Sequence, residues 1–210
     1  MRLSKYHIPF LYHGDTLEET TKGFGKPEDY TWEQLKKIAY RHPTRTQLLN
    51  LEEVFKMVGT QKYLFLDIKT DKIFDRQFAK KIATLVHQYH LQETVIVESF
   101  NPFFLIDMRL SARDIKIMYD FITNITAWGK EAQAQFDKIP WLLKQAFFQK
   151  QMRRIIRPDI LGPRFNVDRK LLQSLINHGY PIVTWTVDTP EVAHNLFNIG
   201  IKGLQTNPSY

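Results

Sequence analysis

Short apolar runs alternate with longer amphipathic runs along this chain, and this alternation is the feature that most constrains its fold. Runs such as 63–68 and 182–187 consist mostly of apolar, β-branched or aromatic residues, which is typical of strands that are buried on both faces. Runs such as 74–89 instead place apolar residues at helical spacing. Buried strands separated by helices form a parallel sheet with helices on its faces, so we expect an α/β fold.

The same pattern predicts an ordered set of elements. The expected strands are 8–13, 63–68, 95–98, 115–119, a short strand at Ile160, 182–187 and 203–205. The expected helices are 31–40, 49–58, 74–89, 102–110, 131–156 with a break at Pro140, 168–177 and 189–198. Thr31 and Gln34 have the spacing of a capping box at the first helix.

These elements fit both an open doubly wound sheet and a barrel. An eight-stranded barrel usually needs about 250 residues, and this chain has 210. No linker or change of composition divides the sequence, so we expect one domain over 1–210.

Composition restricts the kinds of site and partner that this chain can have. The absence of cysteine excludes disulfides, thiolate metal sites and cysteine nucleophiles, and it fits a reducing, cytoplasmic location. No signal peptide is visible, and no apolar run approaches the ~20 residues that span a bilayer. The net charge of +7 favours anionic partners. We do not expect nucleic acid among them, because the basic residues form no recognisable binding module.

Polar residues follow several of the expected strands, where reactive groups of α/β proteins gather. They include His13, Asp67, Lys69, Glu98 and Trp185. Asp67 and Lys69 are two positions apart, so on a strand both point to one face. A carboxylate suits Mg²⁺ or Ca²⁺ and an ammonium suits phosphate, although a buried ion pair would have the same spacing. Trp185 fits either a pocket wall or the core.

A basic segment occupies residues 141–157. From Lys144 to Arg157 it contains no acidic residue. Its cations, which are Lys144, Lys150, Arg153, Arg154 and Arg157, alternate with Phe147, Phe148 and other apolar residues. The segment predicts either peripheral contact with an anionic membrane surface or a barrel helix with a basic solvent face.

Seven runs, in the right order, resemble motifs of the glycerophosphodiester phosphodiesterase family. They are 13–25, 31–35, 51–54, 66–69, 99–101, 185–188 and 203–208. The resemblance implies a TIM-type (β/α)₈ barrel that hydrolyses glycerophosphodiesters to glycerol 3-phosphate and an alcohol with a divalent metal, Mg²⁺ or Ca²⁺.

The resemblance also assigns residues. His13 matches a histidine that acts as general acid or base. Asp67 matches a metal-binding glutamate, and Lys69 matches a lysine that faces the phosphate. Trp185 matches an aromatic residue of the substrate pocket, and we place Glu98 with it as substrate-binding.

Several family features are absent or altered. The first strand and helix of the family, with one histidine and two metal carboxylates, have no counterpart, so we expect a barrel that lacks them. Gly14 occupies the position of an aspartate in the family motif, and Glu19 that of an arginine. Asp67 occupies the position of a glutamate, and Asn207 that of an aspartate. One carboxylate makes a poor Mg²⁺ or Ca²⁺ site, so we expect little or no activity. The alternatives are an inactive remnant that binds a phosphodiester or a membrane surface, and a phospholipase-D-like lipid hydrolase.

Overall fold

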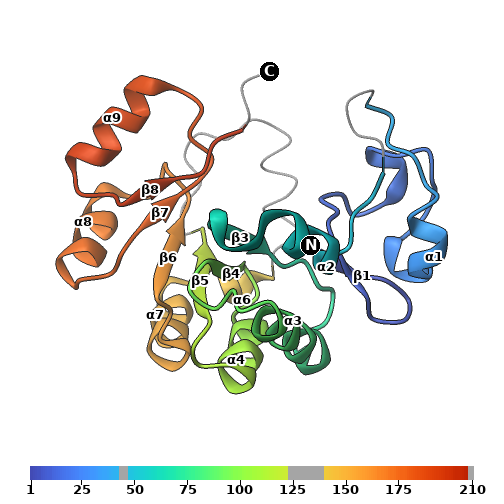
Figure 1. Ribbon diagram of the computed structural model, residues 1–210. Coiled ribbons are helices and arrows are strands. Elements are labelled where there is room, and N and C mark those ends of the chain that lie inside the picture. The colour runs from blue at the N-terminus through green and yellow to red at the C-terminus, as the bar shows by residue number, and fades with distance from the viewer. Residues whose placement is uncertain (43–46, 123–139, 208–210) are drawn as a thin grey trace. The chain divides into compact units, whose positions relative to one another are not determined.

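The computed structural model describes residues 1–42, 47–122 and 140–207, and the chain divides into two compact units, 1–116 and 117–210 (Figure 1). The expected helical residues 131–139 and Pro208 of the last motif lie outside the described residues. The prediction of a single domain over 1–210 stays a prediction.

The first unit holds the elements before residue 117. Its strands are β1 (Arg2–Leu3), β2 (Pro9–Phe10), β3 (Leu64–Asp67) and β4 (Val95–Ser99). Its helices are α1 (Trp32–Leu35), α2 (Leu51–Val58), α3 (Arg76–Gln88) and α4 (Pro102–Ser111), with 3₁₀ turns η1 (Leu17–Glu19), η2 (Pro27–Asp29) and η3 (Gly59–Gln61).

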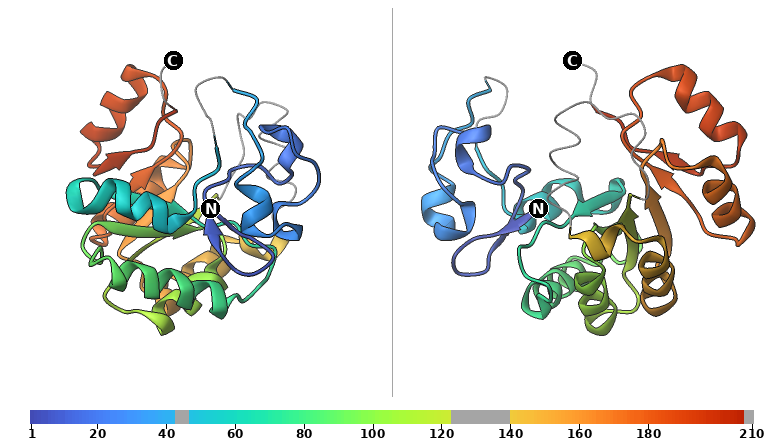
Figure 2. Two further views of the ribbon diagram at one scale, coloured as in Figure 1. Left: turned by 45° about the vertical axis from the view of Figure 1, so that its right-hand side comes forward. Right: turned by 180° about the vertical axis from the view of Figure 1, so that it is seen from behind.

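The strands β3 and β4 form the centre of the first unit. They pair in parallel with Leu64 opposite Val95 and Asp67 opposite Glu98. Helices α3 and α4 pack side by side beneath them (Figure 2), where the rings of Phe78 and Phe104 lie 5.7 Å apart. The helical spacing predicted for 74–89 is confirmed, because the apolar side chains at its core-facing positions are buried.

A second, smaller core lies under the N-terminal part of this unit. Strands β1 and β2 pair antiparallel, and the buried residues of the small core are Phe10, Tyr12, Leu17, Leu35 and Leu48. The capping box of Thr31 and Gln34 is confirmed at α1. The expected strand 8–13 is much shorter than predicted, and β1 was not predicted, because both are two-residue segments of a hairpin rather than members of the parallel sheet.

The second unit repeats a strand–helix pattern. Its elements are β5 (Lys116–Phe121), which begins at the junction, α6 (Trp141–Lys144), α7 (Ala146–Ile156), β6 (Ile160–Pro163), α8 (Arg169–Asn177), β7 (Val183–Thr184), α9 (Pro190–Asn198) and β8 (Gly203–Leu204). β5 pairs in parallel with β6, and β7 with β8. Single bridges from Leu161 to Ile182 and from Arg164 to Trp185 link β6 to the β7 segment.

Close packing fixes one position in this unit. A Cβ atom at Gly162 on β6 would lie 1.9 Å from Oδ1 of Asp120 on β5, so only glycine lets these strands approach. The described part of the expected helix 131–156 is two helices, α6 and α7, that meet at Gln145. Within the described ranges, no helix has the length and apolar character needed to cross a membrane.

Candidate functional site

Two carboxylates stand at the ends of β3 and β4. Asp67 is the last residue of β3, and Glu98, the register partner of Asp67, is the fourth of five residues in β4. Glu98 is buried, whereas the Asp67 side chain is 37% exposed. Beyond the strand, Ile68 N donates to Glu98 O at 2.9 Å and Ser99 Oγ donates to Ile68 O at 3.0 Å. The ladder therefore continues far enough to hold both carboxylates in place.

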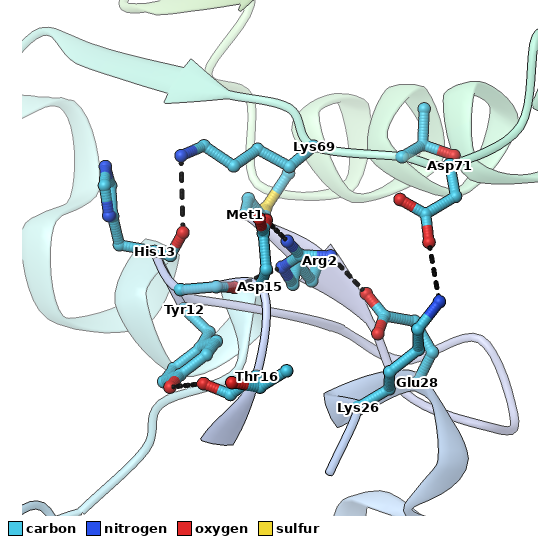
Figure 3. A network of polar contacts seen from close by, with 12 residues as sticks. Met1, Arg2, Tyr12, His13, Asp15, Thr16, Lys26, Glu28, Lys69 and Asp71 are labelled. Carbon is cyan, nitrogen blue, oxygen red and sulfur yellow. Dashed lines mark hydrogen bonds and ion pairs between the residues drawn. The ribbon is translucent and has the colours of Figure 1, made fainter. Parts of the chain in front are cut away.

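Lys69 reaches across this edge toward His13. Its Nζ lies 3.8 Å from Asp67 Oδ2 and donates to the carbonyl oxygen of His13 at 3.3 Å (Figure 3). The Asp67–Lys69 pair is partly exposed on both sides, so the interpretation as an ion pair buried inside the sheet is wrong. Exposed ion pairs stabilise a fold by only about 0–1 kcal/mol. Lys69 thus has its cation where an anionic ligand can reach it.

The ring of His13 is exposed and carries a shifted pKa. Partial desolvation lowers the pKa of His13 first, the positive charge of Lys69 lowers it further, and Asp67 opposes the shift. The protonated ring is the disfavoured form, so the pKa lies below the ordinary value of about 6.5. At neutral pH His13 is therefore an uncharged imidazole that can accept a proton.

The backbone from His13 to Thr16 is held almost entirely by charged and hydroxyl side chains. The His13 carbonyl accepts from Lys69, and the Gly14 carbonyl accepts from Arg2 Nε at 2.7 Å. The amides of residues 15 and 16 both donate to Glu19 Oε1, at 2.7 and 2.9 Å. The Thr16 carbonyl accepts from the Tyr12 hydroxyl at 2.6 Å. We call residues 13–16 the histidine loop.

Arg2 is the anchor of this loop that sequence reasoning missed. Its side chain is only 4% exposed, and besides Gly14 it contacts Asp15 Oδ1 at 2.6 Å and Glu28 Oε1 at 2.7 Å. The guanidinium thereby links β1, the histidine loop and η2 (Figure 3). The available signal was an arginine inside the short extended run 1–3, but its partners are 12 to 26 residues away, as the sequence separations show.

Gly14 and Glu19, two departures from the family pattern, are neighbours in space. A Cβ atom at Gly14 would lie 2.9 Å from Glu19 Oε2 and 3.0 Å from the Tyr12 hydroxyl oxygen. A side chain at position 14 would therefore force the Glu19 carboxylate, which accepts hydrogen bonds from the amides of residues 15 and 16, to shift. We expect the effects of substitutions at positions 14 and 19 to depend on each other.

The residues that could hold a metal are few. Mg²⁺ and Ca²⁺ take six or more oxygen ligands, some of them water. Around Asp67 the strand ends supply one further carboxylate, the buried Glu98. Within the part of the chain that the structure describes, no group of three or more histidine, aspartate, glutamate or cysteine residues could hold a metal ion. The described side chains therefore do not by themselves form a metal centre.

Trp185 lies in the second unit. Its Nε1 donates to the carbonyl oxygen of Gly162 at 2.9 Å, and its carbonyl oxygen accepts from Phe165 N at 3.0 Å. Nearby in sequence, the Asp188 carboxylate accepts two hydrogen bonds from Asn207, one from the backbone N at 2.8 Å and one from Nδ2 at 3.0 Å. Trp185 as a residue is half-buried.

A cleft of about 340 Å³ opens in the first unit beside Lys69. Its walls come from the turn between β1 and β2, from residues 26–29 and from the segment 69–75 that leads into α3. Lys69 lines this cleft, whereas His13, Asp67 and Glu98 do not. The cleft thus adjoins the group of site residues on one side only.

Comparisons with known proteins agree over nearly the whole chain. The model of the glycerophosphoryl diester phosphodiesterase family matches residues 1–209. The chain is 24% identical over 220 aligned positions to the glycerophosphodiester phosphodiesterase of Caldanaerobacter subterraneus subsp. tengcongensis, which covers 99% of this chain and 79% of that protein.

Solved structures share the architecture. A phosphodiesterase of Oleispira antarctica, in complex with the product sn-glycerol-3-phosphate, superposes with a TM-score of 0.79 at 18% identity, over 98% of this chain and 78% of that one. The glycerophosphodiester phosphodiesterase of Thermotoga maritima gives 0.67 at 20% identity, over 98% and 78%. These likenesses show the fold, and the expected TIM-type α/β class is confirmed.

Proposed function

The chain belongs to the glycerophosphoryl diester phosphodiesterase family, and on that premise we propose that it hydrolyses glycerophosphodiesters to glycerol 3-phosphate and an alcohol. The observation that carries the proposal is the meeting of His13, Asp67 and Lys69 at one edge of the first unit. The names of the similar proteins favour this chemistry over a phospholipase-D-like activity.

His13 and Lys69 are the catalytic residues of this proposal. The Lys69 ammonium binds a non-bridging phosphate oxygen and stabilises the charge that grows there when an oxygen nucleophile attacks phosphorus. His13 is neutral at pH 7, so it accepts a proton from the water whose oxygen attacks phosphorus, and it returns that proton to the leaving alcohol oxygen as the ester bond breaks. The histidine loop supports this role because its backbone is fixed by contacts that do not involve the His13 ring.

Asp67 is our candidate ligand for the divalent ion that the family resemblance implies, Mg²⁺ or Ca²⁺. Its carboxylate is accessible at the strand end, whereas Glu98 is buried behind it. A single accessible carboxylate with water as the remaining ligands binds such an ion weakly. We therefore expect slow turnover that depends on high concentrations of the added metal.

Trp185 and Glu98 are the residues that we propose as substrate contacts. We keep Trp185 as an aromatic wall for the substrate because the residue is not fully buried and its motif matches the family. We keep Glu98 as a substrate-binding residue, because it is the register partner of Asp67. A cytoplasmic location also remains our proposal, supported by the absence of cysteine.

The test is a hydrolysis assay with glycerophosphocholine, in which release of glycerol 3-phosphate is measured with Mg²⁺ and with Ca²⁺. We expect slow release that falls about 100-fold or more in His13→Gln and in Lys69→Met. Lys80→Met, on the exposed side of α3, and His194→Gln, on α9, are the matched controls and should keep the parent rate. The proposal fails if the parent releases no product with either ion, or if His13→Gln and Lys69→Met keep the parent rate.

A further inference from the structure

Helix α7 carries its apolar residues on two different sides. The side that faces the second unit buries Gln149, Met152, Arg153 and Ile156. The opposite side exposes two large apolar residues, Phe147 at 74% and Ile155 at 59%. α7 is therefore a packed helix of the fold whose solvent side is also partly apolar, and the two interpretations of segment 141–157 are not exclusive.

The solvent side of α7 carries two adjacent rows of residues. Phe147, the partly exposed Gln151 and Ile155 are four residues apart and form one row along the helix. Lys150 and Arg154, both exposed, form a second row one step around the helix. Two exposed apolar residues, Phe147 and Ile155, thus lie about two turns apart beside two exposed cations. Just before α7, helix α6 exposes Trp141 and Leu142.

One of the five cations of this segment does not belong to the exposed face. Arg153 is buried, and its guanidinium lies 5.3 Å from the ring centroid of Phe121 on β5. Burial lowers the pKa of Arg153, an effect that the nearby tyrosines oppose. Lys144 lies on α6 and Arg157 follows the last residue of α7, so the basic row on α7 consists of Lys150 and Arg154.

We propose that the exposed face of α7, together with Trp141 and Leu142 of α6, binds the surface of an anionic phospholipid bilayer. Single exposed apolar side chains are ordinary on protein surfaces. Here four of them, Trp141, Leu142, Phe147 and Ile155, lie within a segment that has no acidic residue from 140 to 157. Lipid headgroups attract the cations while the aromatic and aliphatic tips enter the headgroup boundary. This proposal does not depend on the proposed hydrolysis.

The chemistry of the face favours lipid over the other anionic partners. A nucleic acid would use the cations but gains nothing from Ile155 and Leu142, which cannot stack on bases. A protein groove that takes a helix face needs apolar residues at i, i+3, i+4 and i+7. The exposed apolar residues of α7 instead lie in one row only, beside cations. This arrangement matches a bilayer surface, where anionic headgroups cover an apolar interior.

The test measures sedimentation of the full chain with vesicles of phosphatidylcholine alone and of phosphatidylcholine mixed with phosphatidylglycerol. We expect binding to the mixed vesicles, little binding to the neutral ones, and release at high salt. Lys150→Glu with Arg154→Glu should weaken binding by about tenfold or more. Phe147→Ser should weaken it by about tenfold through the lost apolar contact.

Matched controls come from the same unit. Arg169→Glu with Lys170→Glu on α8 makes the same change in net charge, and Phe197→Ser on α9 removes another exposed phenylalanine. Both controls should bind within about twofold of the parent, and circular dichroism should show that every variant is folded. The proposal is overturned if the α7 variants bind as the controls do, if mixed vesicles bind no better than neutral ones, or if the parent binds an oligonucleotide but neither kind of vesicle.

Discussion

The two halves of the candidate site are held in different ways. Asp67 and Glu98 stand on β3 and β4, where a parallel ladder of backbone hydrogen bonds and a core of buried side chains fix them. His13 stands on the histidine loop, where side chains from Arg2, Glu19, Tyr12 and Lys69 hold the backbone instead. The backbone ladder and the core therefore hold Asp67 and Glu98 in position, whereas a small set of polar side-chain contacts holds His13.

This difference separates what a mutation does to the molecule from what it does to the site. A change in the β3–β4 core lowers the stability of the whole unit, because the strands are part of its centre. A change among the side chains of the histidine loop acts on a surface segment that can open without unfolding the rest. The comparison therefore predicts global effects for the strands and local effects for the loop.

The largest effect is expected from the strand half. Val97 is fully buried on β4, and Val97→Ala should lower the free energy of unfolding by about 2 kcal/mol through lost contacts and a small cavity. Hydrogen exchange should quicken for the amides of β3 and β4. The amides of residues 15 and 16 should keep their exchange rates, since their opening is local. Equal acceleration in both places would mean that the two halves are not separate.

Arg2→Met should have the next largest effect on the free energy of unfolding. It should speed hydrogen exchange in the histidine loop rather than in the strands. Methionine keeps much of the buried stem but loses the hydrogen bonds to Gly14, Asp15 and Glu28. We expect a loss of about 1–2 kcal/mol, because Asp15 and Glu28 are exposed enough to regain water. The amides of residues 15 and 16 should exchange faster than those of β3. Lys5→Met, an exposed control in the turn between β1 and β2, should change neither quantity.

A double-mutant cycle sharpens the description of the loop. Gly14→Ala and Glu19→Ala should each cost about 1 kcal/mol, the first by contact with the Glu19 carboxylate and the second by loss of its two amide contacts. In the double variant the contact with Glu19 is gone, so the total should fall short of the sum by about 0.5 kcal/mol or more. Thermal or denaturant unfolding measures this.

The control cycle pairs Gly14→Ala with Glu18→Ala. The Glu18 carboxylate accepts from the amide of Gly25 at 2.8 Å and does not approach Gly14, so these two changes should add. Additivity in the Glu19 cycle as well would contradict the coupling.

The smallest expected effect concerns Lys69, a charge that contacts both halves. Lys69→Met removes a positive charge near His13, so the protonated ring is less disfavoured and the pKa of His13 should rise. It should stay below the ordinary range, since desolvation is the larger cause. A proton NMR titration of the ring measures this, with Lys62→Met as the control. A pKa that stays the same or falls would show that Lys69 does not act on the ring.

The fold was largely predictable from sequence because it depends on periodicity. The strand runs 63–68 and 95–98 and the helices 74–89 and 102–110 all appear with ends shifted by a few residues. The strand expected at 182–187 is a two-residue strand with single bridges on either side. Apolar runs indicate burial, but they do not indicate how many residues find a ladder partner.

The site was predictable only where it rests on strands. The spacing of Asp67 and Lys69 predicted a shared face, and the 3.8 Å contact between them confirms it. The role of Arg2 was not predictable, because its contacts join residues that are far apart in sequence and follow no periodic rule. The lack of room for a side chain at Gly14 was also not predictable, because it depends on where the Glu19 carboxylate lies.

The close approach of Glu19 to Gly14 also restricts how this sequence can change. A single mutation that restores the family's aspartate at position 14 places a second carboxylate against Glu19, and restoring only the arginine at position 19 removes the acceptor for the loop amides. We expect either single substitution to lower the free energy of unfolding. Positions 14 and 19 should therefore be changed together when the family motif is rebuilt in this chain.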